Sequence, residues 1–101
     1  MRIFVMFDLP VGTVGERREY TKFRKYLIES GYLMLQESIY CKLAQNSVMA
    51  DALVDNLRKN KPKSGLVQVL KITEKQYEKM EVIVGEFSSD VLDTDERLVI
   101  L

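Results

Sequence analysis

The chain of 101 residues contains no histidine. Histidine provides the base of Ser-His-Asp and Cys-His catalysis, ligands of most catalytic zinc sites and the acid and base of many nucleases, so these mechanisms are excluded. Any reaction that this protein catalyses must use carboxylates, lysines, tyrosines, hydroxyl groups or a hard metal ion bound through oxygen.

Cysteine is nearly absent, because Cys41 is the only one in the sequence. A single cysteine rules out an internal disulfide and suits a reducing compartment, and on an expected strand Cys41 is interpreted as a small buried apolar residue. The N-terminal apolar run is shorter than the core of a signal peptide, and no stretch approaches the length of a membrane span. We therefore expect a cytoplasmic protein with no membrane contact.

Net charge is absent as well, since 15 basic residues balance 15 acidic ones. Nothing global attracts such a chain to nucleic acid, so any electrostatic binding must come from a local arrangement of its lysines and arginines. The length and an apolar content of 47% fit one domain with one core.

The hydrophobic pattern predicts the order strand, helix, strand, strand, helix, strand. The expected strands are 2–7, 32–36, 38–43 and 66–72, and the expected helices are 13–30 and 46–60. Thr13 and Glu16 have the spacing of a capping box, Gly31 stands at the usual C-terminal position, and Asn46 or Ser47 caps the second helix. The apolar stripes of the two helices are Tyr20, Phe23 and Leu27, and Met49, Leu53 and Leu57.

This order predicts an α+β fold, the ferredoxin-like βαββαβ sandwich with an antiparallel sheet and both helices on one face. Residues 1–101 form one domain, with a core over 1–72 and a dimerising extension over 73–101. The first strand is apolar on both sides, so a second copy is expected to cover the open face. The extension holds a short helix at TEKQYEKM, a possible strand at EVIVG and, after a polar stretch, a terminal strand 98–101 that adds to the partner's sheet edge. The prediction is a strand-exchanged homodimer.

The first strand ends on a single carboxylate, Asp8, before Pro10 and Gly12 break the chain. One interpretation is an Asx-type hydrogen bond that caps the turn. The other is a catalytic metal ligand: a two-fold dimer duplicates Asp8, and two copies would share one Mg²⁺ or Mn²⁺ per dimer that activates water against a phosphodiester. A close pair of carboxylates would alternatively only raise the pKa of each group.

Basic residues form two groups along the sequence. Arg18, Lys22 and Lys25 fall at i, i+4 and i+7 on one ridge of the first helix, and a second cluster comprises Arg58, Lys59, Lys61 and Lys63. Such groups either bind a phosphate backbone without sequence preference or are simply solvated. Ser38 either hydrogen-bonds near Asp8 or closes a bulge, and Tyr32 and Tyr40 either stack on bases or, as we favour, pack in the core.

The stretch FVMFDLP, followed by GERREYTKFRKYLIESGYLMLQESIYCKL, resembles the family of CRISPR-associated protein two, the small dimeric member of the spacer-adaptation pair. The resemblance extends through VLKITEKQYEKMEVIVGE and DERLVIL, which are similar to the subgroup that accompanies the large single-protein RNA-guided nuclease. It implies a ferredoxin-like homodimer that bridges integrase subunits and lies under duplex DNA. It also implies a metal-dependent nuclease of single-stranded RNA or duplex DNA, with Asp8 as metal ligand and Arg17 and Arg18 on nucleic acid.

Two hypotheses follow for the function. The first is a dimeric scaffold that positions duplex DNA and integrase subunits during spacer acquisition, and the second is a metal-dependent endonuclease that uses paired Asp8 residues. A third, a regulatory module that binds a metabolite between subunits, would gain support if neither DNA nor an integrase partner were bound. Only one carboxylate per chain stands at the expected site, with Glu16 and Glu37 as possible helpers.

Overall fold

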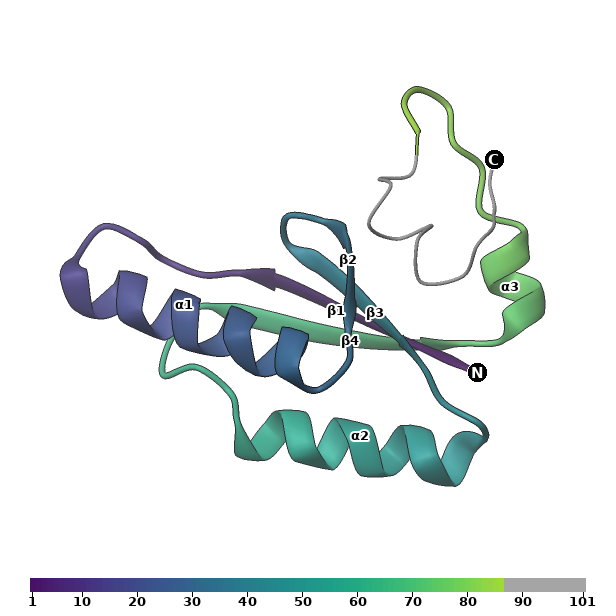
Figure 1. Cartoon of the computed structure of the whole chain (residues 1–101), viewed down its shortest axis with the longest axis horizontal. Coiled ribbons are helices and arrows are strands. Elements are labelled where there is room, and N and C mark those ends of the chain that lie inside the picture. Colours follow the sequence, from purple (N-terminus) through teal and green to yellow (C-terminus); the bar gives the residue numbers. More distant parts are fainter. Residues whose placement is uncertain (87–101) are drawn as a thin grey trace.

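The computed structural model describes residues 1–86. Figure 1 shows two long helices on one side of a twisted sheet and a short third helix on the other side. The strands are β1 (Arg2–Asp8), β2 (Leu33–Gln36), β3 (Ile39–Leu43) and β4 (Leu66–Ile72). The helices are α1 (Val14–Glu29), α2 (Ser47–Lys59) and α3 (Glu74–Glu78).

The four strands form one sheet in the order β2-β3-β1-β4, and every pairing is antiparallel. This order and the βαββαβ sequence of elements confirm the predicted ferredoxin-like fold. β1 is a central strand, hydrogen-bonded to β3 on one side and to β4 on the other. The register shift in the β2–β3 pair falls between Met34 and Gln36, close to the expected bulge.

One face of the sheet is closed by α1 and α2. Alternate residues of β1 point to this face because successive side chains of a strand point to opposite sides. The side chains that meet there are almost completely buried: Ile3, Val5 and Phe7 from β1, Tyr40 from β3, Phe23 and Leu27 from α1, and Ala50 and Leu57 from α2. This layer is the hydrophobic core of the chain.

The ends of α1 follow the predicted signals. The Thr13 hydroxyl accepts a hydrogen bond from the Glu16 amide at 3.1 Å, and the Glu16 carboxylate accepts one from the Thr13 amide at 3.0 Å. This capping box pairs two amide groups that the first turn of a helix leaves without partners. The chain leaves α1 through Gly31, whose φ of 90° is a conformation that glycine adopts without strain.

α2 begins at the first of its two predicted caps, because the Asn46 side chain accepts the amide of Met49 at 2.9 Å. The predicted apolar stripe was wrong at Met49, which is 47% exposed, whereas its neighbour Ala50 is fully buried. The buried face runs through Ala50, Leu53 and Leu57, one residue later at its start than the sequence spacing suggested. A capping position fixes the rotation of the first turn and turns Met49 outward.

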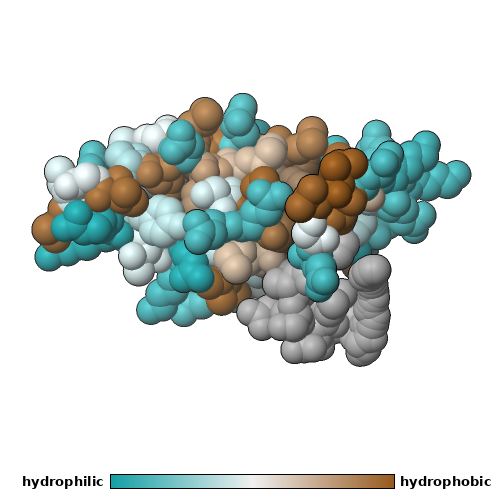
Figure 2. Space-filling view, turned by 90° about the horizontal axis from the view of Figure 1, so that it is seen from above, coloured by the Kyte–Doolittle hydropathy of each residue, from teal (hydrophilic) through white to brown (hydrophobic). Residues whose placement is uncertain are grey.

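The other face of the sheet, here called the open face, is covered by neither α1 nor α2. Figure 2 looks onto it and shows apolar side chains across its middle. Phe4 and Met6 of β1 are only half-buried, and Leu66 and Leu70 of β4 are 53% and 50% exposed. Phe4 pairs directly with Leu70, so these side chains share one face. The open face is therefore largely apolar, as the two-sided pattern of the first strand predicts, with one polar interruption at the exposed Gln68, which lies opposite Met6.

α3 packs at one end of the open face. The Tyr77 ring lies edge-on to Phe4, with ring centroids 6.0 Å apart, and the Arg2 guanidinium lies 4.0 Å from the Tyr77 ring centre. Arg2 also forms an ion pair of 3.0 Å with Glu74. These contacts, which join the first strand to the start of the extension, cover the end of the open face opposite to Asp8.

The segment 81–85 was expected as a possible strand, and that expectation was wrong for the single chain, where it is irregular. Ile83 and Val84 are 85% and 92% exposed, and none of the four described strands pairs with them. The expected polar stretch from residue 87 and the terminal strand 98–101 lie outside the described residues. Within residues 1–86, no helix combines the length and apolar character that crossing a membrane requires.

Candidate metal and nucleic-acid site

Asp8 occupies the last position of β1, opposite Leu66 of β4, at the rim of the open face. Its side chain is exposed, and no hydrogen bond or ion pair from residues 1–86 holds its carboxylate. The Asx-type turn considered from the sequence is therefore not formed. Asp8 therefore presents an exposed carboxylate without a partner from residues 1–86 at the end of the central strand.

Gly65 fixes the backbone next to Asp8. A methyl group on Gly65 would lie 2.9 Å from the Asp8 carbonyl oxygen and 2.7 Å from the Leu9 side chain, and Gly65 has a φ of 96°. Both observations require glycine there, because any side chain would push β4 away from the Asp8 loop. Sequence reasoning missed this residue, although a glycine directly before an apolar strand is a recognisable signal.

The loop after Asp8 is held by polar contacts from the start of α1. The Glu16 carboxylate accepts hydrogen bonds from the amides of Gly12 and Thr13, both at 3.0 Å, and an Nη of Arg17 donates to the Val11 carbonyl at 3.1 Å. Glu16 is therefore engaged within the loop. The Arg17 guanidinium is likewise used in part to fix the shape of the loop beside Asp8.

Ser38 lies at the same end of the sheet as Asp8. Its backbone carbonyl accepts the Phe7 amide at 3.0 Å, which continues the β1–β3 ladder beyond the pairing of Met6 with Ile39. Because Phe7 directly precedes Asp8, this bond places Ser38 beside the end of β1. The second possible helper, Glu37, is exposed in the β2–β3 turn.

Hard divalent cations take about six oxygen ligands, with one or two carboxylates among them. Residues 1–86 contain no group of three or more His, Cys, Asp or Glu side chains that could enclose a metal ion. The donor type of Asp8 fits Mg²⁺ or Mn²⁺, and its carboxylate has no competing partner in that range. Residues 1–86 nevertheless place one free carboxylate at this position, which is fewer than a hard cation usually takes from protein.

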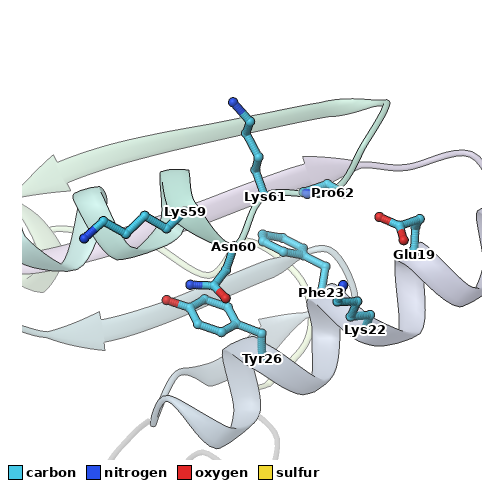
Figure 3. A pocket seen from close by; sticks show the side chains of 8 residues that line it. All are labelled: Glu19, Lys22, Phe23, Tyr26, Lys59, Asn60, Lys61 and Pro62. Carbon is cyan, nitrogen blue, oxygen red and sulfur yellow. The ribbon is translucent and has the colours of Figure 1, made fainter.

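The basic ridge of α1 is exposed along its length, at Arg18, Lys22 and Lys25. The structure brings one member of this ridge next to the second basic cluster, because Lys22 lines a cleft with Lys59 and Lys61 (Figure 3). Arg58 is used differently, in an exposed ion pair of 2.5 Å with Asp55. The two groups of basic residues thus meet on the helix side of the molecule.

The two candidate base-stacking tyrosines are core residues. Tyr40 is fully buried, stacks on Phe7 with centroids 5.8 Å apart and accepts a hydrogen bond of 2.9 Å from Arg24. Tyr32 is 4% exposed, and burial raises its pKa to about 12. The predicted core packing of both rings is confirmed, and neither can stack on a base.

Cys41 is buried as well, at 2% exposure, but it lies on the open-face side of β3 rather than in the closed-face core. The Arg2 guanidinium lies 3.9 Å from its sulfur, but burial dominates and raises the pKa of the thiol. A thiol that stays protonated is a poor nucleophile. The interpretation of Cys41 as a small buried residue is confirmed.

The fold and this geometry define a small ferredoxin-like α+β protein with an exposed acid at the end of its central strand. Residues 1–80 match the family model described as CRISPR associated protein Cas2. The chain belongs to the Cas2 family, as its sequence pattern indicated.

Two relatives show how far the similarity extends. A protein of Treponema denticola named CRISPR-associated endoribonuclease Cas2 is 55% identical over 101 residues, which cover all of both chains. A protein of the same name from Streptococcus mutans is 42% identical over all of this chain and 93% of its own length. The crystal structure of Streptococcus pyogenes Cas2 at pH 6.5 matches with a TM-score of 0.60. It covers 83% of this chain and 100% of that one at 15% identity, which supports the fold alone.

Proposed function

We propose that two copies of this chain form a dimer that binds nucleic acid during CRISPR adaptation and that carries one shared metal-dependent phosphodiesterase site. The observation that carries the proposal is Asp8, an exposed carboxylate without a partner in residues 1–86, at the rim of an apolar sheet face. The name endoribonuclease, which the relatives bear, supports phosphodiester cleavage as the chemistry.

The dimer is proposed from the open face. Phe4, Met6 and Leu70 expose apolar area that water solvates poorly, and each Å² removed from water contributes about 25 cal/mol. A second copy presents the same surface, so a two-fold pairing covers both at once. The exposed segment with Ile83 and Val84 follows α3 and is proposed to pair with the partner's sheet edge.

Pairing about a two-fold axis would bring the two Asp8 side chains to one site. Each carboxylate would then be close to a like charge, which strengthens cation binding and disfavours two negative charges without a cation. Gly65 and the loop contacts of Glu16 and Arg17 keep the end of β1 in place, so the pair is held by the backbone rather than by flexible side chains. The Asp8 pair would hold one Mg²⁺ or Mn²⁺.

A hard cation bound there supplies Lewis-acid polarisation of a phosphate oxygen and a water of lowered pKa. The chain contributes the negative ligands that retain it and the exposed basic residues Arg18, Lys22 and Lys25, which neutralise the phosphate backbone. Because these contacts would go to phosphate rather than to base edges, the protein is proposed to cleave without strong sequence preference.

A second function is favoured by the small number of metal ligands. Because residues 1–86 place one carboxylate at the site, metal affinity would depend on the pairing, and a scaffold without turnover is the alternative. In that role the dimer would lie under duplex DNA and bridge two integrase dimers, as the family resemblance implies. The same basic surface would serve both roles.

The Asp8→Asn variant separates these functions. We expect it to lose Mn²⁺-dependent cleavage of single-stranded RNA or duplex DNA by at least about a hundredfold, because the site loses both of its charges. Asp55→Asn is the matched control, because it removes an exposed carboxylate whose surface ion pair stabilises little. Loss of cleavage with intact spacer acquisition means that the chemistry is real and dispensable. Unchanged cleavage by the purified variant contradicts the Asp8 site.

Mixed dimers test whether the site is shared. Co-refolding equal amounts of wild type and Asp8→Asn yields one quarter wild-type homodimers if chains pair at random. A site that needs both carboxylates then retains about a quarter of the activity, whereas independent sites retain about half. An activity that stays at half contradicts the shared site even if Asp8 is essential.

A further inference from the structure

Between the two ends of the open face, β1 and β4 contribute one polar side chain, that of Gln68 in β4. Gln68 pairs with Met6 across the strands, and Leu66 and Leu70 stand two positions away from it on either side along β4. Its side chain is exposed, and no hydrogen bond within residues 1–86 involves its amide group. An amide with an unused carbonyl oxygen therefore stands among apolar neighbours.

The register of the sheet places Gln68 next to Asp8. Asp8 pairs with Leu66, two positions before Gln68, so Asp8 and Gln68 are diagonal neighbours on the same face of the sheet. The Cα atoms of such diagonal neighbours lie about 7–8 Å apart, which is within reach of a long side chain. Among the residues that β1 and β4 direct to the open face, only these two carry side-chain oxygen atoms. The sheet therefore brings a carboxylate and an amide carbonyl to the same end of the open face.

The remaining charged group of β1 on this face is out of reach of Gln68. Arg2 pairs with Ile72, four residues along β4 from Gln68, which is about 14 Å at 3.4 Å per residue. The Arg2 guanidinium is also occupied by its ion pair with Glu74. The proposed pairing of two chains would remove the Gln68 amide from water, and a buried polar group without a partner is unfavourable. A cation bound at Asp8 would give the carbonyl oxygen of this amide a partner.

An amide oxygen suits this position better than a further carboxylate would. The carbonyl oxygens of asparagine and glutamine are ligands of hard cations, which take about six oxygens. Two Asp8 carboxylates carry two negative charges, which balance one divalent cation, and two Gln68 oxygens add ligands without adding charge. Phosphate would therefore approach a site that is less negative than one built from four carboxylates.

We propose that Gln68 is a second oxygen ligand of the divalent cation at Asp8, so that each chain provides one carboxylate and one amide carbonyl. The inference rests on the proposed function, because the cation and the pairing of the chains are those proposed there. Two chains together would provide four of the roughly six oxygens, and the other positions stay open to water and phosphate. The polar interruption of the open face is then part of the metal site.

Binding of Mn²⁺ alone, followed by the electron paramagnetic resonance signal of the free ion, tests this assignment without nucleic acid or turnover. Gln68→Met keeps the length of the side chain and removes its oxygen, so it should weaken Mn²⁺ binding by at least about tenfold. Gln68→Glu replaces the carbonyl by a carboxylate and should strengthen the binding. The matched controls are Gln45→Met and Gln45→Glu, at an exposed position near the start of β1, where the Ala44 amide donates to the Met1 carbonyl.

All variants are compared as dimers, at a protein concentration where sedimentation equilibrium gives the mass of two chains. Both Gln45 variants should bind Mn²⁺ like wild type. Binding by Gln68→Met that equals that of wild type overturns Gln68 as a ligand, as does a Gln68→Glu variant that binds no more tightly.

The Asp8→Asn variant separates this inference from the proposed function, because it should lose Mn²⁺ binding whatever the role of Gln68. If Asp8→Asn loses Mn²⁺ while Gln68→Met retains it fully, the Asp8 site stands and the Gln68 ligand is overturned. If wild type binds no Mn²⁺, or Asp8→Asn binds it like wild type, the proposed site fails and the Gln68 ligand fails with it.

Discussion

The two faces of the sheet differ in how completely their apolar side chains are covered. On the closed face, Ile3 and Val5 of β1 are completely buried by α1 and α2. On the open face, Phe4 and Met6 alternate with them along the same strand and are only partly buried. The same seven-residue strand thus contributes one row of side chains to the buried core and one row to the partly exposed open face.

This difference links the closed face to the folding of one chain and the open face to the association of two chains. The closed face needs nothing from another molecule, because its rings and aliphatic chains contact each other from four elements. Within residues 1–86, the open face is covered at the end where α3 brings Tyr77 onto Phe4. We infer that substitutions on the closed face change the stability of the chain, and that substitutions on the open face change how copies associate.

The largest effect is expected on the closed face. Phe23→Ala empties a site that is 2% exposed and in edge contact with Phe7, so it should lower the free energy of unfolding by about 3–5 kcal/mol. Urea denaturation measures this change. Ile28→Ala, on the exposed side of the same helix, should lower it by less than about 1 kcal/mol. Equal losses in the two variants would remove the distinction between core and surface on α1.

The next effect is expected on the open face. Leu70→Asp places a charge in the middle of the proposed interface and should weaken self-association by at least about a hundredfold, equivalent to about 2.7 kcal/mol. The thermal midpoint of wild type should rise with protein concentration, and that of the variant should not. Val48→Asp, at a residue that is 75% exposed in the first turn of α2, is the control and should retain the concentration dependence. A thermal midpoint of wild type that does not change with protein concentration would contradict the pairing of two chains through the open face.

A smaller effect is expected where the two faces meet, at the loop after Asp8. Thr13→Ala removes the hydroxyl that accepts the Glu16 amide, and it should lower the free energy of unfolding by about 1 kcal/mol. Thr13→Ser keeps the acceptor and should recover most of the loss. If the alanine and serine variants are equally stable, the capping box contributes nothing to holding this loop.

The smallest effect at neutral pH concerns a polar group inside the closed face. The Tyr32 hydroxyl has no hydrogen-bond partner within residues 1–86, and burial raises its pKa from 10.0 to about 12. Between these two pH values the unfolded chain loses a proton that the folded chain keeps, so stability falls as pH rises through this window. Tyr32→Phe should show a shallower decline, by up to about 1.4 kcal/mol per pH unit, and no loss at neutral pH. Parallel declines in urea titrations of both proteins would contradict this assignment.

Much of this architecture could be predicted from the sequence because local signals agree with the fold. The Thr13 and Glu16 pair, Gly31 and the two-sided pattern of β1 each act through neighbouring residues and gave the right elements. The prediction that Met49 faces the core was wrong because a spacing of three or four residues does not fix the rotation of a helix about its axis. The Asn46 cap and the packing of the helix on the sheet set that rotation.

The candidate site was predicted less completely, because its residues are joined by the fold rather than by the sequence. Asp8 was found from its position after an apolar strand, and its exposure agrees with a ligand role that still stays a prediction. Gly65 was missed because its contact is with a loop 56 residues earlier in the chain. The meeting of Lys22 with Lys59 and Lys61 likewise requires the packing of α1 beside the end of α2.

The most direct test of the account is the mass of the wild-type protein by sedimentation equilibrium over a wide range of concentration. We predict a mass of two chains that persists on dilution and that falls to one chain in the Leu70→Asp variant. A single-chain mass for wild type at every concentration would contradict both the scaffold and the shared Asp8 site, since each depends on a second copy covering the open face.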